Sequence, residues 1–89
     1  MHYVWDSAKD ALNRKKHGLA LSDGVPAVED PQREDWIDDR FDYGEERRVT
    51  LGLANQGVLY VVSTEAGEEV TRIISVRRAQ PNEIARYLG

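Results

Sequence analysis

The sequence contains no cysteine, so the protein can form neither a disulfide bond nor a zinc site built on thiolates. Its first residues lack both the basic region and the apolar stretch that make up a secretory signal peptide. No apolar run approaches the roughly 20 residues that a helix needs to cross a bilayer. From these absences we expect a cytoplasmic protein with no membrane partner.

Common catalytic motifs are missing as well. The sequence has no glycine-rich loop of the kind that cradles a phosphate group. Its two histidines, His2 and His17, are not spaced as a pair of metal ligands and have no cysteine near them. We therefore expect the protein to use neither a cofactor nor a metal ion.

The length and composition are those of a small globular protein. The 89 residues are enough for one domain, which we place at residues 1–89. Hydrophobic residues make up 40% of the chain and charged residues 31%, which is ordinary for a soluble fold. A core of this size is small, and such folds are often completed by a partner chain.

The charge is distributed unevenly along the chain. The net charge of −4 alone argues against binding to nucleic acid. However, residues 1–20 and residues 47–89 each carry a net charge of +2, while residues 21–46 carry −8. Two basic regions thus flank one acidic segment. This pattern fits a phosphate site on one face and a basic partner on another.

The first half of the chain predicts a short strand and two helices. Tyr3, Val4 and Trp5 favour a strand, and Asp6 is a good cap for a helix over residues 7–17 that Gly18 ends. A brief helix is expected over residues 22–28, with Pro26 tolerated only in its first turn. An edge strand is expected near Trp36 within an otherwise acidic loop.

The second half predicts an antiparallel meander followed by a helix. Residues 46–54, 58–64 and 70–78 are rich in strand-forming residues and are separated by tight turns. Pro81 opens a closing helix over residues 81–88, which we expect to face the sheet through Ile84, Tyr87 and Leu88. The predicted fold class is α+β, an antiparallel sheet with N-terminal helices and a closing C-terminal helix.

The residues that could carry chemistry are a dispersed set of cations, one carboxylate and one phenol. They are Lys16, His17, Glu46, Arg47, Arg72, Arg77, Arg78 and Tyr87. Strict alternation along the strand places Arg72 and Arg77 on opposite faces of the sheet. A site that uses both therefore requires the strand to twist or to end there.

Two of these residues have an alternative structural interpretation. Arg72 has apolar neighbours on its own face, so it must reach an anion or a water-filled groove, unless it pairs with a carboxylate such as Glu46 or Glu65 on a neighbouring strand. His17 is either a proton-transfer group or a histidine stabilised by the dipole at the end of its helix. Taken alone, these residues indicate a small α+β domain with a clustered cationic face and name no substrate.

The sequence also resembles the BrnT toxin family over nearly its whole length. The matching stretches, in order, are Val4-Trp5-Asp6, Lys16-His17-Gly18, Asp30-Pro31, Gly44-Glu45-Glu46-Arg47 with Gly52, and Arg72-Ile73-Ile74-Ser75-Val76-Arg77. The resemblance implies a fold similar to that of RelE-type ribonucleases. It also implies a metal-independent endoribonuclease that cleaves RNA and arrests growth.

The resemblance further implies a partner and a set of roles. The partner is a cognate BrnA-like antitoxin, a ribbon-helix-helix protein through which the complex contacts DNA only indirectly. The catalytic group comprises Arg72 and Arg77 as phosphate clamps, with His17 or Glu46 as the proton shuttle. The RNA-binding residues implied by the resemblance are Lys16, Arg47 and Tyr87.

Two other hypotheses remain open. The chain is either a degenerate, non-catalytic member that serves as a protein-interaction or operon-regulation module, or an unrelated small regulatory domain. A neighbouring gene for a ribbon-helix-helix protein would argue against the unrelated regulatory domain. A test of growth on expression separates an active toxin from the non-catalytic member.

Overall fold

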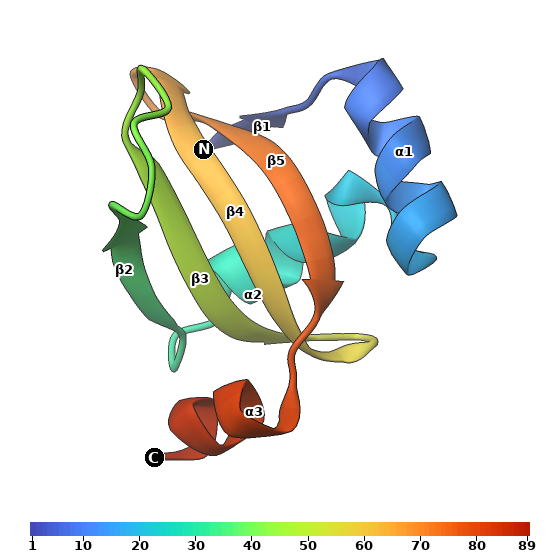
Figure 1. Cartoon of the computed structure of the whole chain (residues 1–89), viewed down its shortest axis with the longest axis vertical. Coiled ribbons are helices and arrows are strands. Elements are labelled where there is room, and N and C mark those ends of the chain that lie inside the picture. Colours follow the sequence, from blue (N-terminus) through green and yellow to red (C-terminus); the bar gives the residue numbers. More distant parts are fainter.

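The computed structural model describes all residues, 1–89, as three strands of a meander joined to two short strands and a few helices (Figure 1). None of the helices has the length and apolar character needed to span a bilayer. The elements in chain order are β1 (His2–Val4), α1 (Ser7–His17), the 3-10 helix η1 (Leu21–Gly24), α2 (Val25–Glu29), β2 (Glu34–Asp38), β3 (Arg47–Ala54), β4 (Gly57–Gly67), β5 (Val70–Arg78) and α3 (Pro81–Leu88).

The five strands form one sheet in the order β1-β5-β4-β3-β2. Strands β2 to β5 are antiparallel as expected. The expectation of a purely antiparallel sheet was wrong, because β1 pairs in parallel with the start of β5, from His2–Val70 to Val4–Arg72. No tight hairpin fixes the direction of β1. The long connection through α1, η1 and α2 sets it instead.

Helix α1 begins and ends where the sequence predicts. Asp6 caps its start, because one carboxylate oxygen accepts hydrogen bonds from the backbone N–H groups of Ala8 and Lys9 at 2.8 and 3.1 Å. Gly18 ends it with a φ of 70° and donates its N–H to the carbonyl of Arg14. The second predicted helix is instead a 3-10 turn followed by α2, with Pro26 in the first turn of α2.

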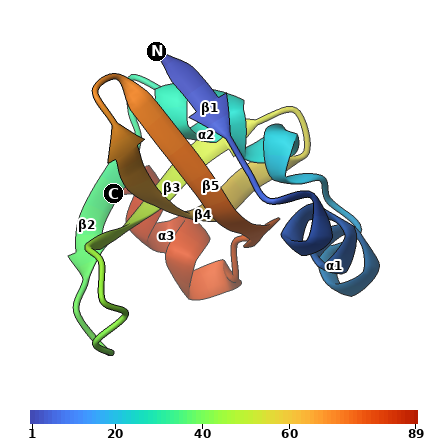
Figure 2. The ribbon, with the colours of Figure 1, turned by 90° about the horizontal axis from the view of Figure 1, so that it is seen from above.

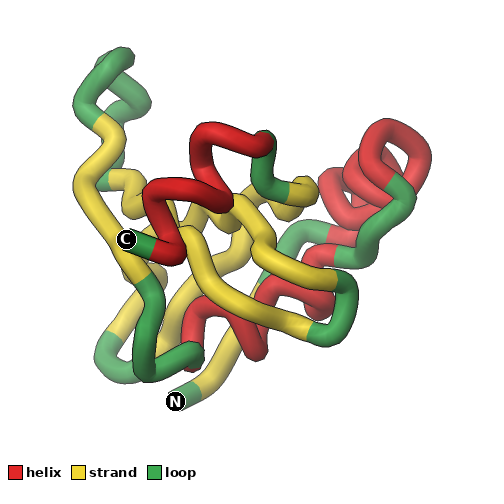
Figure 3. Tube along the Cα trace, turned by 90° about the horizontal axis from the view of Figure 1, so that it is seen from below, coloured by secondary structure: helices red, strands yellow, loops and turns green.

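The helices cover both faces of the sheet (Figures 2 and 3). Helix η1 and α2 lie on one face, where they complete the core, and α3 lies on the other. The backbone of α2 approaches β3 so closely that a Cβ atom at Gly52 would lie 2.1 Å from the carbonyl oxygen of Ala27. The core cluster consists of Leu19, Leu21, Ala27, Leu59, Val61, Ile73 and Val76.

The closing helix α3 is held mainly by polar contacts, which differs in part from the expectation. Leu88 is 77% exposed and does not face the sheet. The hydroxyl of Tyr87 instead donates to Asp30, and Arg86 pairs with Glu34 of β2 at 2.7 Å. Polar bonds to Asp30, to β2 and, through Glu83, to Arg77 of β5 therefore help to fix the position of this helix.

A β-bulge on β5 changes which of its side chains share a face. Ser75 pairs with Val62 and Ile73 with Ser63, so that Ile74 is an extra residue without a partner on β4. Consequently Ile73 and Val76 both enter the core, although they are three residues apart. Strict alternation was therefore the wrong assumption. Arg72, opposite Thr64, and Arg77, opposite Tyr60, lie on the same face of the sheet.

Candidate functional site

A cleft between α1 and β5 gathers positive charge. It has a volume of about 660 Å³, and its lining includes no carboxylate. Its lining residues are Lys9, Leu12, Asn13, Lys15, Lys16, His17, Ile74 and Ser75. We call this the cationic cleft. The three lysines and the histidine that line this hollow would favour an anion over a cation.

Asn13 fixes the wall of the cationic cleft. Strand β1 covers only the first part of β5, which leaves the edge near Val76 without a strand partner. The side-chain amide of Asn13 takes that place: it accepts from the N–H of Val76 at 3.0 Å and donates to its carbonyl at 2.9 Å. The same amide donates to the carbonyl of Leu19 at 2.8 Å. This buried side chain therefore ties α1 to the sheet.

His17 stands at the end of α1, beside the cationic cleft. Burial, followed by the positive charges of Lys16 and Arg77, lowers the pKa of His17 below its usual value. This direction is the opposite of that expected for a histidinium stabilised by a helix dipole. At neutral pH His17 is therefore mostly an uncharged imidazole, which can accept a proton.

Arg77 is held between an aromatic ring and a carboxylate. Its guanidinium lies 3.8 Å from the centre of the Tyr60 ring and donates two hydrogen bonds to Glu83 of α3, at 2.8 and 2.9 Å. The bond to Glu83 raises the pKa of Arg77, while the same contact lowers the pKa of Glu83. The guanidinium is thus preorganised, with a carboxylate in the position that an oxyanion could take.

Aromatic rings extend the site across the same face of the sheet. Trp36 meets Tyr60 edge to face, with ring centres 6.3 Å apart, and Arg86 lies 4.1 Å from the centre of the Trp36 ring. Trp36, Tyr60, Arg77 and Arg86 together form what we call the aromatic face. Planar rings and guanidiniums in this arrangement are surfaces on which nucleobases stack.

Arg72 and Arg47 lie farther along this side of the sheet. Arg72 bonds both carboxylate oxygens of Glu45 at 2.8 Å, rather than pairing with Glu46 or Glu65. Arg47 lies 4.0 Å from the centre of the Tyr43 ring. The β4 partners of Arg72 and Arg77 are four residues apart, which corresponds to about 13 Å along the strand. Different carboxylates hold the two guanidiniums, so the structure does not bring them to one anion.

Glu46 and Tyr87 are not part of this arrangement. Glu46 lines a second cleft that is described below, and the hydroxyl of Tyr87 donates to Asp30. Asp30 also accepts the N–H of Leu53 at 2.8 Å, which places Tyr87 beside the far end of β3. Of the residues expected to act together, the structure brings Lys16, His17 and Arg77 close to one another.

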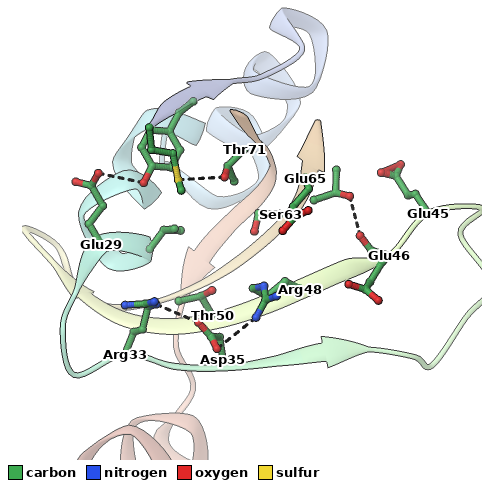
Figure 4. A pocket seen from close by; sticks show the side chains of 14 residues that line it. Glu29, Arg33, Asp35, Glu45, Glu46, Arg48, Thr50, Ser63, Glu65 and Thr71 are labelled. Atoms are coloured by element: carbon green, nitrogen blue, oxygen red, sulfur yellow. Dashed lines mark hydrogen bonds and ion pairs between the residues drawn. The ribbon is translucent and has the colours of Figure 1, made fainter. Parts of the chain in front are cut away.

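The second cleft has the opposite charge (Figure 4). It has a volume of about 720 Å³ and is lined by five carboxylates and only two guanidiniums. Its lining residues are Met1, Tyr3, Val28, Glu29, Arg33, Asp35, Glu45, Glu46, Arg48, Thr50, Ser63, Thr64, Glu65 and Thr71. We call this the acidic cleft. The two clefts separate charges that the overall value of −4 conceals.

Sequence reasoning missed the roles of Asn13 and Tyr60. An asparagine inside a predicted helix carries no sign that its amide will bind a strand edge 63 residues away. Tyr60 could have been placed beside Arg77 only with the register of β4 and β5 in hand. The pairing of neighbouring strands was predicted, whereas the register was not.

Comparisons with known proteins point in one direction. The model of a family described as the ribonuclease toxin BrnT of type II toxin–antitoxin systems matches residues 5–83. The crystal structure of the Brucella abortus ribonuclease toxin BrnT is similar in fold, with a TM-score of 0.64 at 23% identity over 90% of this chain and 99% of that one. No curated protein matches the sequence. The expected likeness to RelE-type ribonucleases stays a prediction.

Proposed function

Because the chain belongs to the BrnT family of ribonuclease toxins of type II toxin–antitoxin systems, we propose that it is a metal-independent endoribonuclease. In this proposal it arrests growth in the bacterial cytoplasm until a BrnA-like, ribbon-helix-helix antitoxin neutralises it. Contact with DNA occurs only through that antitoxin. The observation that carries the proposal is the cationic cleft, where three lysines and His17 line one hollow with no carboxylate among the lining residues.

The charge of the cationic cleft supports binding to the RNA backbone. Lys9, Lys15 and Lys16 would each neutralise phosphate charge, and the cleft's own lining offers no competing anion. A base flanking the bound phosphate would stack on the aromatic face, next to Tyr60. Arg47 and Arg72 would contact other nucleotides of the same strand. In this arrangement a protein with a net charge of −4 can still bind RNA locally.

His17 is the proposed proton shuttle. Its neutral imidazole takes the proton of the 2′-hydroxyl as the 2′-oxygen attacks the adjacent phosphorus atom. The bond from phosphorus to the 5′-oxygen then breaks, and the imidazolium returns its proton to that oxygen. The products are a 2′,3′-cyclic phosphate and a free 5′-hydroxyl. No metal ion is needed to balance this reaction.

Arg77 is the proposed clamp on the reacting phosphate. Its two N–H groups now bind Glu83, and a phosphate that replaced this carboxylate would receive the same pair of hydrogen bonds. Negative charge grows on the phosphate oxygens as the 2′-oxygen attacks, so the guanidinium binds the transition state more tightly than the ground state.

Cleavage of RNA by the purified protein in the presence of EDTA tests this proposal. We expect the wild type to cleave and His17→Gln to lose about 100-fold or more of the rate, as for removal of a general base. The matched control is His2→Gln, which changes the exposed histidine of β1 and should leave the rate unchanged. Arg77→Gln should lose activity, whereas Arg78→Gln, its exposed neighbour, should not.

The results of these assays distinguish a wrong assignment of the site from an absence of nuclease activity. Full activity of both His17→Gln and Arg77→Gln would show that the reaction takes place elsewhere. A wild-type protein that neither cleaves RNA nor slows growth on induction would refute the nuclease proposal. If such a protein still bound an antitoxin tightly, the non-catalytic interaction module would replace it.

A further inference from the structure

The acidic cleft lies away from the proposed RNA site and is not used by the mechanism. Residues of β1, α2, β2, β3, β4 and β5 line it, on the sheet face that α2 partly covers (Figure 4). Four of its five carboxylates belong to the acidic segment, residues 21–46, and with two arginines in the lining the cleft has an excess of negative charge. RNA would be repelled from a hollow with this charge. Its occupant should therefore be positively charged.

Some of the carboxylates in the acidic cleft are already neutralised and others are not. Asp35 binds both Arg33 and Arg48, at 3.0 and 3.5 Å. Glu45 binds Arg72 outside the cleft.

The remaining three carboxylates have no cationic partner. Glu29 accepts only the hydroxyl of Tyr3, at 3.0 Å. The side chains of Glu46 and Glu65 make no hydrogen bond or ion pair within the chain. Three uncompensated negative charges around one hollow leave the cleft able to bind a cation from outside.

An unsatisfied hydroxyl on the cleft floor gives a second, independent indication. Thr50 is fully buried, and its Oγ1 atom has no hydrogen-bond partner. It lies beside Asp35 on the neighbouring strand (Figure 4). Ser63, another residue of the floor, is only 3% exposed. A buried hydroxyl without a partner is costly, so the part of the floor at Thr50 is suited to a donor that enters the cleft.

We propose that the acidic cleft receives arginine or lysine side chains from the antitoxin, which anchor it to the face of the sheet opposite the RNA. That the partner is an antitoxin rests on the proposed function. An antitoxin that binds DNA must carry basic groups, and these are complementary to the acidic cleft. A bare metal ion fits less well, because no three carboxylate or histidine ligands are grouped closely enough to hold one.

A hexa-arginine peptide is the first probe, because it tests the cleft whether or not the protein is a toxin. We expect the full chain to bind the labelled peptide in fluorescence anisotropy, and binding should weaken as salt is added. In the variant Glu29→Gln with Glu65→Gln the dissociation constant should rise about tenfold. The matched control, Asp39→Asn with Glu68→Gln, removes the same charge from exposed sites and should change it less than about twofold.

Thr50→Val tests the floor separately from the charges. Valine has nearly the same shape and removes the unsatisfied hydroxyl, so the thermal midpoint of the free protein should stay the same or rise. Peptide binding should nevertheless weaken about threefold, because the entering donor loses an acceptor. A variant that is less stable and binds as before would contradict the role of Thr50.

A second experiment uses the antitoxin itself. The product of the neighbouring gene is co-expressed with either the wild-type toxin or the Glu29→Gln, Glu65→Gln variant, and growth is followed. We expect weaker rescue for the variant, with RNA cleavage by the purified variant unchanged. Equal peptide binding by the cleft variant and the control variant would overturn the inference even if RNA is cleaved. Absence of RNA cleavage by the wild type would overturn the proposed function and leave the peptide result standing.

Discussion

Asn13→Ala is expected to be one of the most damaging single changes in the protein. The substitution removes two hydrogen bonds to Val76 and one to the carbonyl of Leu19. Asn13 is only 6% exposed, so water cannot easily take the place of its amide. At about 1–3 kcal/mol for each buried group left unsatisfied, we expect a loss of about 3 kcal/mol. A chain of this length has a total stability of about 4–13 kcal/mol.

Urea unfolding followed by tryptophan fluorescence measures this loss. The midpoint should fall with little change in the slope, and Tm should fall by about 12–24 °C. Asn82→Ala, at an exposed position of α3, is the matched control and should change the stability by less than about 0.5 kcal/mol. A loss below about 1 kcal/mol for Asn13→Ala would refute the view that this amide replaces a strand at the edge of β5.

Three further changes test other parts of the fold. Gly52→Ala should prevent cooperative folding, because the new Cβ would lie 2.1 Å from the Ala27 carbonyl oxygen. The control Gly67→Ala should fold, because no atom lies nearer than 3.8 Å to its new Cβ, and circular dichroism melts distinguish the two variants. Hydrogen bonding to Arg40 lowers the pKa of Asp38 from 3.8 to about 2, so its stabilising contribution is complete above pH 3.8 and is lost as the pH falls towards 2. The urea midpoint should show this acid dependence in the wild type and show less of it in Asp38→Asn. Tyr87→Phe removes the bond to Asp30 and should cost about 1 kcal/mol, with faster amide hydrogen exchange confined to α3.

Elements whose signals are local were predictable from the sequence. The cap residue Asp6 and the left-handed Gly18 define the two ends of α1 through hydrogen bonds to residues at most four positions away. The tight turns near Gly57 and Gly67 likewise join strands that pair with their neighbours. These predictions were confirmed because each depends on interactions between residues close in the chain.

Features that depend on distant residues were not predictable. The direction of β1 in the sheet depends on the path of the chain through α1, η1 and α2. The bulge at Ile74 depends on how the side chains of β5 and β4 fit together. That bulge decides the face of Arg72 relative to Arg77. The partners of both arginines, Glu45 and Glu83, lie on a loop and on a helix that no pattern placed next to them. The uneven charge along the chain does correspond to two separate clefts of opposite charge, whereas the phosphate site and the basic partner expected from it stay predictions.

In the proposed mechanism RNA binds in the cationic cleft and not in the acidic cleft. The most direct test is to titrate the ¹⁵N-labelled protein with a short 2′-O-methyl RNA, which lacks the attacking hydroxyl, and to follow backbone amide shifts by NMR. We expect the largest shifts in residues 15–18 and 74–78, and unchanged shifts in the acidic cleft around Thr50 and Glu65. Shifts centred on the acidic cleft, with residues 15–18 unaffected, would contradict it.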